Sequence, residues 1–210
     1  MQTYSHYIIT AFLGRQVKKR EARSGLRWLP PLSPSALMIG SIAPDVPLIT
    51  IAIIFLLADW FGVRLVDAHG PAFSSNTAYL FRYMFFHEPG VKAAHNLFHA
   101  PLLVISYTGV GYGAWRTRKR WGPALFWFGL ACALHTAIDI PLHYDDGPLL
   151  LFPFDWQTRF YSPISYWDPT RYGRPFAIFE HLLVLGMVIY LVVDWRRSRR
   201  TLSVETVGKQ

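Results

Sequence analysis

Residues 121–140 read WGPALFWFGLACALHTAIDI, and the length and composition of this stretch decide the fold. It is almost wholly apolar until it reaches His135 and Asp139 near its end. A helix needs about 20 predominantly apolar residues to cross a bilayer. Three other runs, residues 36–58, 97–115 and 176–195, approach that length. We therefore expect an all-α protein, an integral membrane helical bundle of about four transmembrane helices, plus a short N-terminal helix over residues 4–13.

The composition supports lipid as the solvent. Of the 210 residues, 52% are hydrophobic and only 16% are charged, which is apolar beside an ordinary soluble domain. This length predicts one membrane-embedded domain over residues 1–200, followed by a cytoplasmic tail over 201–210. The single cysteine, Cys132, excludes an intramolecular disulfide. The first apolar run has no basic residue before it, so we expect no cleaved signal peptide.

The net charge of +8 comes from blocks of basic residues between the apolar runs. Segments 15–27, 116–120 and 196–210 hold six, four and five of the 21 Lys and Arg residues. Blocks separated by apolar runs do not form the continuous basic face that nucleic acid needs, so we expect no nucleic-acid partner. The positive-inside rule places all three blocks on one side. It predicts a multi-pass protein of the inner (plasma) membrane with both termini in the cytoplasm.

Ionisable residues inside or beside the apolar runs are candidates for chemistry, because a charge near hydrocarbon is costly without a partner. His95 and His99 are four residues apart, as are His135 and Asp139, so on a helix each pair projects from one face. Imidazole and carboxylate together suit zinc, and also manganese or iron. We predict a divalent metal site, zinc first, drawn from His6, Asp45, His99, His135 and Asp139.

Each of these residues also has a simpler interpretation. A lone His in a helix is more often a hydrogen-bonded core residue than a ligand. Asp45 follows Pro44, which can kink a helix and aim the carboxylate inward, but Asp45 also fits the N-cap of a helix that begins at Val46. The polar turn 141–148 could support a ligand histidine or simply be solvated. Glu180 and His181 are secondary candidates for the same interior.

The order of the motifs resembles a known family. The motifs are Ser5-His6, GSIAPD (40–45), HNLFHAPLL (95–103) and ALHTAIDIPLHYDDGPLLLFPF (133–154). This order is similar to that of the predicted membrane-bound metal-dependent hydrolases, which include a LexA-regulated inner-membrane protein. That family's pattern is an early His, Pro-Asp-x-Asp, H-R-G-x-T-H-S and H-x-x-x-D, followed by a Gly-containing stretch that ends in Trp-Pro or Phe-Pro.

The resemblance implies functional roles for the residues that match the family's pattern, with Gly147 and Pro153 matching its structural part. The matches are His6, Asp45, His95, His99, His135 and Asp139. The departures are Pro47 in place of a second Asp, Asn96 in place of Arg, and Phe98 and Ala100 in place of Thr and Ser. The H-x-x-x-D motif alone also looks like that of zinc-dependent phospholipase C.

Three functional hypotheses follow. The first is a membrane-bound metal-dependent hydrolase that cleaves an ester or phosphoester of a lipid-linked or small-molecule substrate, with Asp45 or His95 as the catalytic acid or base. The second is a metal-binding carrier or sensor without catalysis, since buried ionisable groups also mark ion pathways. The third is a structural membrane protein whose histidines bond one another, which predicts no bound metal.

Overall fold

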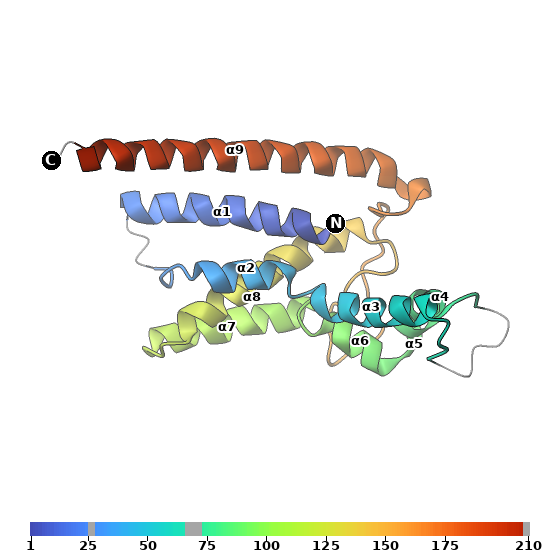
Figure 1. Ribbon diagram of the computed structural model, residues 1–210. Helices are drawn as coiled ribbons and strands as arrows, with labels where there is room; N and C mark the ends of the chain where they lie inside the picture. The colour runs from blue at the N-terminus through green and yellow to red at the C-terminus, as the bar shows by residue number, and fades with distance from the viewer. Residues whose placement is uncertain (25–27, 66–72, 208–210) are drawn as a thin grey trace.

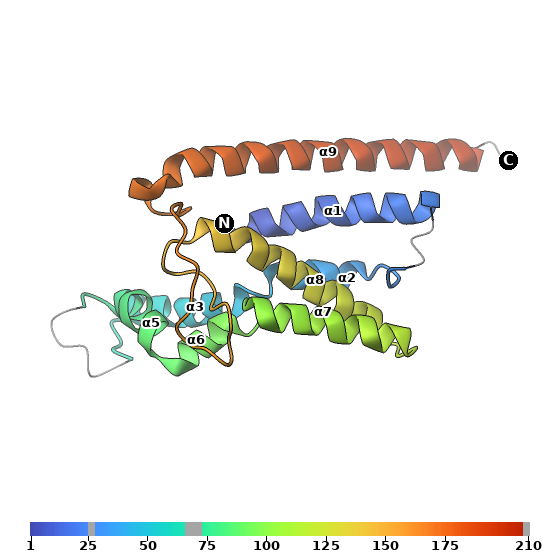
Figure 2. The same cartoon turned by 180° about the vertical axis from the view of Figure 1, so that it is seen from behind.

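The computed structural model describes residues 1–24, 28–65 and 73–207, and this part of the chain is built from helices (Figures 1 and 2). One isolated antiparallel bridge joins Leu149 and Arg159. The α-helices are α1 (Thr3–Ser24), α2 (Pro34–Ile42), α3 (Val46–Trp60), α4 (Asn76–Tyr79), α5 (Phe85–His87), α6 (Pro89–Asn96), α7 (Pro101–Arg116), α8 (Gly122–Asp139) and α9 (Gly173–Val207). A π-helical turn covers Leu80–Met84, and 3₁₀ turns cover Ile140–Leu142 and Pro169–Arg171.

Helix α8 is the centre of the bundle and packs against α7 and α2. Glycines permit the close approach that this packing needs. A Cβ at Gly40 of α2 would overlap the backbone carbonyl of Phe128 on α8, and a Cβ at Gly129 of α8 would overlap the backbone of Thr108 on α7. At these two glycines no side chain separates the backbones, so α8 packs in direct backbone contact with both α2 and α7.

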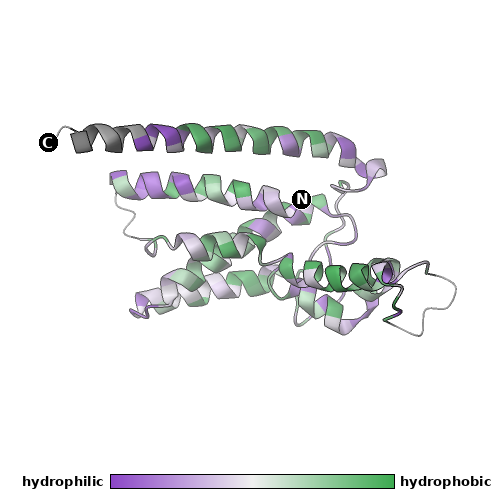
Figure 3. Ribbon diagram, in the orientation of Figure 1, coloured by the Kyte–Doolittle hydropathy of each residue, from purple (hydrophilic) through white to green (hydrophobic). Residues whose placement is uncertain are grey.

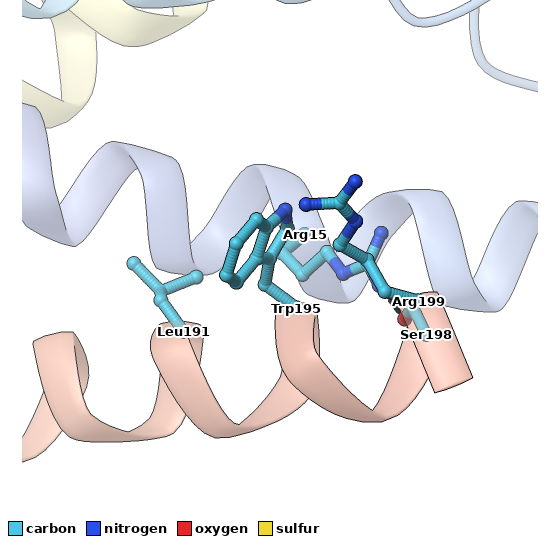
Figure 4. Close-up of a pocket in the computed structure, with 5 residues that line it drawn as sticks. All are labelled: Arg15, Leu191, Trp195, Ser198 and Arg199. Atoms are coloured by element: carbon cyan, nitrogen blue, oxygen red, sulfur yellow. Dashed lines mark hydrogen bonds between the residues drawn. The ribbon is translucent and has the colours of Figure 1, made fainter. Parts of the chain in front are cut away.

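Helix α1 is longer than the sequence indicates. The predicted short helix over 4–13 continues to Ser24, because Lys, Arg and Glu residues propagate a helix well. The segment that begins at Arg15 is therefore mostly helix rather than a connection. Arg15 donates to Asp194 of α9 through Nε at 2.5 Å and to Ser198 through an NH₂ nitrogen at 2.7 Å, and Lys19 also pairs with Asp194. Figure 4 shows Arg15 beside Trp195, Ser198 and Arg199 of α9.

Among the residues that the structure describes, two helical segments are long and apolar enough to cross a membrane: Gly122–Leu142 and Gly173–Arg199. The bent pair Pro34–Ile42 and Val46–Trp60, with 49° between its halves, could form a third span. The predicted run 97–115 gives only the 16-residue α7, because a turn occupies residues 97–99 and the helix begins at Pro101. The prediction of about four spans is therefore confirmed only as a helical protein with two or three candidate spans.

The exposed surfaces of α9 and α3 are strongly apolar. On α9 the side chains of Ile178 and Leu182 are 65% and 64% exposed, and on α3 that of Leu56 is 60% exposed. Figure 3 shows these apolar segments between hydrophilic regions. The basic half of α1, the α7–α8 turn and the basic part of α9 lie at one end of the bundle, whereas Met1 lies away from that end (Figures 1 and 3).

Candidate metal centre

The predicted ligands converge where four segments meet. These segments are the start of α1, the break between α2 and α3, the turn before α7 and the last turn of α8. Asp45, His99, His135 and Asp139 each offer one ligand atom, and these atoms all lie within 4.8 Å of one another. Residues 45 and 139, far apart in sequence, thus share one site, as the pattern of spaced His and Asp predicts.

The α2–α3 break explains how Asp45 reaches this point. Helix α2 ends at Ile42, and Asp45 occupies the N-cap position of α3 but makes no capping hydrogen bond. Its carboxylate instead accepts a 2.5 Å hydrogen bond from Thr3 and lies 3.4 Å from Nε2 of His135. Of the two interpretations of Asp45, the one in which Pro44 bends the chain inward describes its side chain better.

Asp139 is the most heavily contacted of the four residues. One carboxylate oxygen lies 3.1 Å from Nε2 of both His99 and His135, and the other lies 2.9 Å from Nε2 of His6. The amino group of Met1 also lies 2.9 Å from this second oxygen. His6 stacks on His135 with 3.6 Å between ring centroids. His6 therefore lies directly beside the four-residue group, through Asp139.

The bonding of His135 fits a cation. Its Nδ1 lies 2.8 Å from the backbone carbonyl oxygen of Ser41, an acceptor, so Nδ1 carries the proton. In the neutral ring Nε2 then presents a lone pair. This nitrogen is buried and makes no hydrogen bond, yet carboxylate oxygens of Asp45 and Asp139 lie close to it. A lone pair and two carboxylates that face one another repel unless a proton on Nε2 or a metal ion lies between them, and a His–carbonyl bond commonly orients metal-binding imidazoles. The residues present therefore fit a divalent metal.

The pair His95 and His99 is close, but not for the predicted reason. The predicted continuous helix ends at Asn96, and His99 lies in the following turn, where Thr136 of α8 donates a 2.8 Å hydrogen bond to its backbone carbonyl. The rings still approach, with 4.7 Å between centroids. His95 is outside the four-residue group, and both of its ring nitrogens are buried without a hydrogen-bond partner. Burial, followed by the charge of His99, lowers the pKa of His95 well below its usual value.

The secondary candidates differ from one another. Glu180 is buried but accepts a hydrogen bond from the backbone of Gln2, and His181 contacts Tyr4, so this pair ties α9 to the start of the chain. His143, from the polar turn 141–148, lies closer to the site, because its Nε2 is 3.8 Å from Asp139 and its Nδ1 is 3.1 Å from Asp146. The polar turn is therefore not simply exposed to solvent, because His143 lies beside Asp139 of the four-residue group.

A cavity of about 630 Å³ opens beside the four-residue group. Asp45, His95, His99, Asp139 and His143 contribute to its lining, together with aromatic residues and both signs of charge: Phe81, Arg82, Phe85, Phe86, Asp145, Asp146, Tyr166 and Trp167. Its volume is within the range of small-molecule binding sites. Neither Arg82 nor Trp167 is evident as a site residue from the sequence, because both come from long aromatic-rich connections without a motif.

On the cavity wall, the carboxylate of Asp146 contacts the indole of Trp167 and the imidazole of His143. Trp167 donates through its indole N–H to Asp146 at 2.9 Å. Burial alone would raise the pKa of Asp146, but the neighbouring His143 and the Trp167 donor hold it below its usual value. Burial, together with the charges of Asp139 and Asp146, raises the pKa of Tyr166. At neutral pH this wall therefore presents the Asp146 carboxylate and the neutral phenol of Tyr166.

No family model matches this sequence, and no curated protein or solved structure is found to be similar to it.

Proposed function

We propose that this protein is a membrane-bound metal-dependent hydrolase that cleaves an ester or phosphoester bond. One observation carries the proposal: two imidazoles and two carboxylates from three separate segments meet within 4.8 Å beside a cavity large enough for a substrate. Such groups are costly to collect in an apolar bundle without a function. The resemblance of the motifs to membrane-bound metal-dependent hydrolases supports the same interpretation.

Asp45, His99, His135 and Asp139 would hold the metal, with His6 supporting Asp139 from behind. Two histidines and two carboxylates suit zinc first, and manganese or iron as alternatives. A divalent ion bound there would polarise the scissile carbonyl or phosphoryl oxygen and lower the pKa of water from 15.7 to about 7.

The chain's own residues have distinct tasks in this scheme. Ser41 and Thr3 orient His135 and Asp45, so neither ligand has to reorganise when a substrate enters. His95 faces the cavity with both nitrogens unpartnered, which leaves it able to accept or donate a proton at the substrate. Because Asp45 belongs to the four-residue group, His95 is the better of the two catalytic acid–base candidates.

We place the basic end of the bundle in the cytoplasm and the metal centre toward the opposite side. The arrangement of the basic segments at one end, seen in Figures 1 and 3, supports this placement under the positive-inside rule. Helix α1 runs in the same direction as α9, with Met1 away from the basic end. In this proposal the C-terminal tail is cytoplasmic and Met1 is not, which replaces the expectation that both termini are cytoplasmic.

The test is hydrolysis by the purified protein in detergent, loaded with zinc or manganese. Wild type should cleave bis-p-nitrophenyl phosphate or p-nitrophenyl esters. His135→Ala should lose at least about a hundredfold in rate, because both the ligand and its support are removed, while its helical circular dichroism stays unchanged. His87→Ala is the control, because His87 is exposed and contacts Tyr83.

Two outcomes would reject hydrolysis. Cleavage by His135→Ala at the wild-type rate would show that the metal centre is not the catalyst. Stoichiometric metal with no turnover of any ester or phosphoester would instead support a carrier or sensor, for which the replacement of the family's second Asp by Pro47 is the observation in favour.

A further inference from the structure

The cavity beside the metal centre carries opposite charges on its walls. Arg82 lies on one part of the lining, and Asp145 and Asp146 come from the polar turn after α8. Arg82 makes no ion pair or hydrogen bond within the described part of the chain, and Asp145 makes none there either. Asp145 has only a longer-range attraction to Arg159. Two charges of opposite sign that form no ion pair, on one lining, indicate a ligand that carries both signs.

Different parts of the lining suit the two charges of such a ligand. Trp167 lines the cavity, is 58% exposed, and is fixed by its hydrogen bond to Asp146. Asp146 already pairs with His143, whereas its chain neighbour Asp145 lies on the same lining and forms no ion pair in the described residues. An indole face near such a carboxylate is a favourable site for an ammonium group, through cation–π and ionic attraction. Arg82 and a divalent ion held by the four-residue group would provide the cationic contacts that a phosphodiester requires.

The remaining lining is apolar and continues toward a lipid-facing helix. Leu48 and Phe86 pack in the cluster formed by Phe55, Leu80 and Phe85, while Phe81 is 43% exposed. Leu48 belongs to α3, whose outer face is exposed and apolar. Phe81 and Arg82 lie on the π-helical turn Leu80–Met84, a type of distortion that frequently occurs at functional sites.

A buried polar group on the lining also lacks a partner. His95 is only 5% exposed, and neither of its ring nitrogens forms a hydrogen bond. A buried unpaired imidazole is costly, so its position on the cavity wall points to a polar ligand that would satisfy it.

We infer that the substrate of this site is a zwitterionic phospholipid, whose phosphodiester lies between the metal centre and Arg82 and whose ammonium lies against Asp145 and Trp167. The acyl chains would follow Phe81, Phe86 and Leu48 toward α3. This inference rests on the proposed function, because it names the substrate class of the same site.

The experiment measures binding rather than turnover, so that it can fail independently of the hydrolase proposal. Purified full-length protein is loaded with zinc and titrated with dihexanoylphosphatidylethanolamine, dihexanoylphosphatidylglycerol, dihexanoylglycerol or glycerophosphoethanolamine, with the initial change in tryptophan fluorescence, before any turnover, as the readout. We expect phosphatidylethanolamine to bind about tenfold more tightly than phosphatidylglycerol and the uncharged diacylglycerol to bind weakest. Weak binding of glycerophosphoethanolamine would show that the acyl chains contribute.

Variants separate the two charges. Arg82→Gln should weaken both phospholipids about tenfold, and Asp145→Asn should weaken only phosphatidylethanolamine, which removes the selectivity. Arg174→Gln and Glu88→Gln, which are outside the cavity lining, should leave both affinities unchanged. Equal binding of the two phospholipids by wild type, unchanged selectivity in Asp145→Asn, or glycerophosphoethanolamine binding as tightly as the lipid would overturn the inference.

Discussion

Asp139 has the most contacts within the candidate metal centre. It is 2% exposed and lies at the junction of His6, His99 and His135. No Lys or Arg side chain pairs with it in the described part of the chain. The amino group of Met1 supplies one positive charge, 2.9 Å from one oxygen. The other oxygen faces His99 and His135, where positive charge comes either from protons on the imidazoles or from a metal ion. Asp139 therefore joins the histidines of the group, while hydrogen bonds with Thr3 and Ser41 orient Asp45 and His135.

The hydrogen bond from Thr3 to Asp45 is the orienting contact that a substitution tests best. Thr3→Val keeps the shape of the side chain and removes the hydrogen bond to Asp45. Loss of such an orienting contact typically weakens metal affinity by about 10–100-fold. We expect this loss in a competition titration with a zinc-selective chelator. Thr50→Val is the matched control, because that hydroxyl bonds only the backbone of its own helix; equal affinities in the two variants would contradict the role of Thr3.

At the scale of helices, the α2–α8 contact sets the geometry of the centre. Gly40 touches the α8 backbone at Phe128, and the next residue, Ser41, supplies the carbonyl that holds His135. Any side chain at position 40 would separate the two helices. Packing and ligand orientation are thus coupled through two adjacent residues.

Gly40→Ala should therefore reduce both stability and metal affinity. Overpacking of this kind costs about 1–3 kcal/mol, which corresponds to a fall in Tm of roughly 2–12 °C for a chain of this length. Thermal unfolding in detergent and a zinc titration measure the two effects. Gly109→Ala, where a Cβ would meet nothing within 4 Å, should leave both unchanged or raise Tm slightly. A Gly40→Ala protein as stable as this control would show that the contact is not tight.

The sequence predicts those parts of the site that depend on local spacing. His135 and Asp139 are four residues apart on one helix and do contact each other. Pro44 before Asp45 predicts the bend that the α2–α3 break confirms. The spacing of His95 and His99 gives the right proximity but the wrong element, because local spacing does not reveal that α6 ends at Asn96.

The supporting contacts could not be predicted in the same way. Thr3 and Ser41 act on residues that are 42 and 94 positions away in the chain, and Ser41 does so through its backbone, which leaves no side-chain signal. Arg82 reaches the cavity from the π-helical turn Leu80–Met84 and Trp167 from an irregular connection, and neither segment has a sequence periodicity that predicts the direction of its side chains. Tertiary packing alone brings them together.

At the scale of the whole molecule, basic residues and exposed apolar surface are separated, so the two ends of the bundle differ in charge (Figure 3). Basic segments gather at one end, whereas Met1 lies away from it, and exposed apolar helices lie between hydrophilic regions (Figures 1 and 3). This distribution is the one that a lipid bilayer stabilises across its two unequal faces. In the orientation proposed above, the cavity opens away from the cytoplasm.

Cysteine labelling in intact cells tests that direction. Thr170→Cys, close to the start of α9, should react with a membrane-impermeant maleimide, and Lys119→Cys, in the α7–α8 turn, should react only after the cells are opened. Native Cys132 is buried, so it should contribute little background. Labelling of Lys119→Cys alone in intact cells would reverse the orientation.

The metal content of the purified protein tests the central claim most directly. Wild type reconstituted with zinc and passed through a desalting column should retain about one equivalent by elemental analysis, and Asp139→Asn should retain less than about a tenth of that amount, because the shared carboxylate loses its charge. Circular dichroism should show the same helical content in both. Wild-type protein that retains no metal, or an Asp139→Asn variant that retains as much as wild type, would contradict the account.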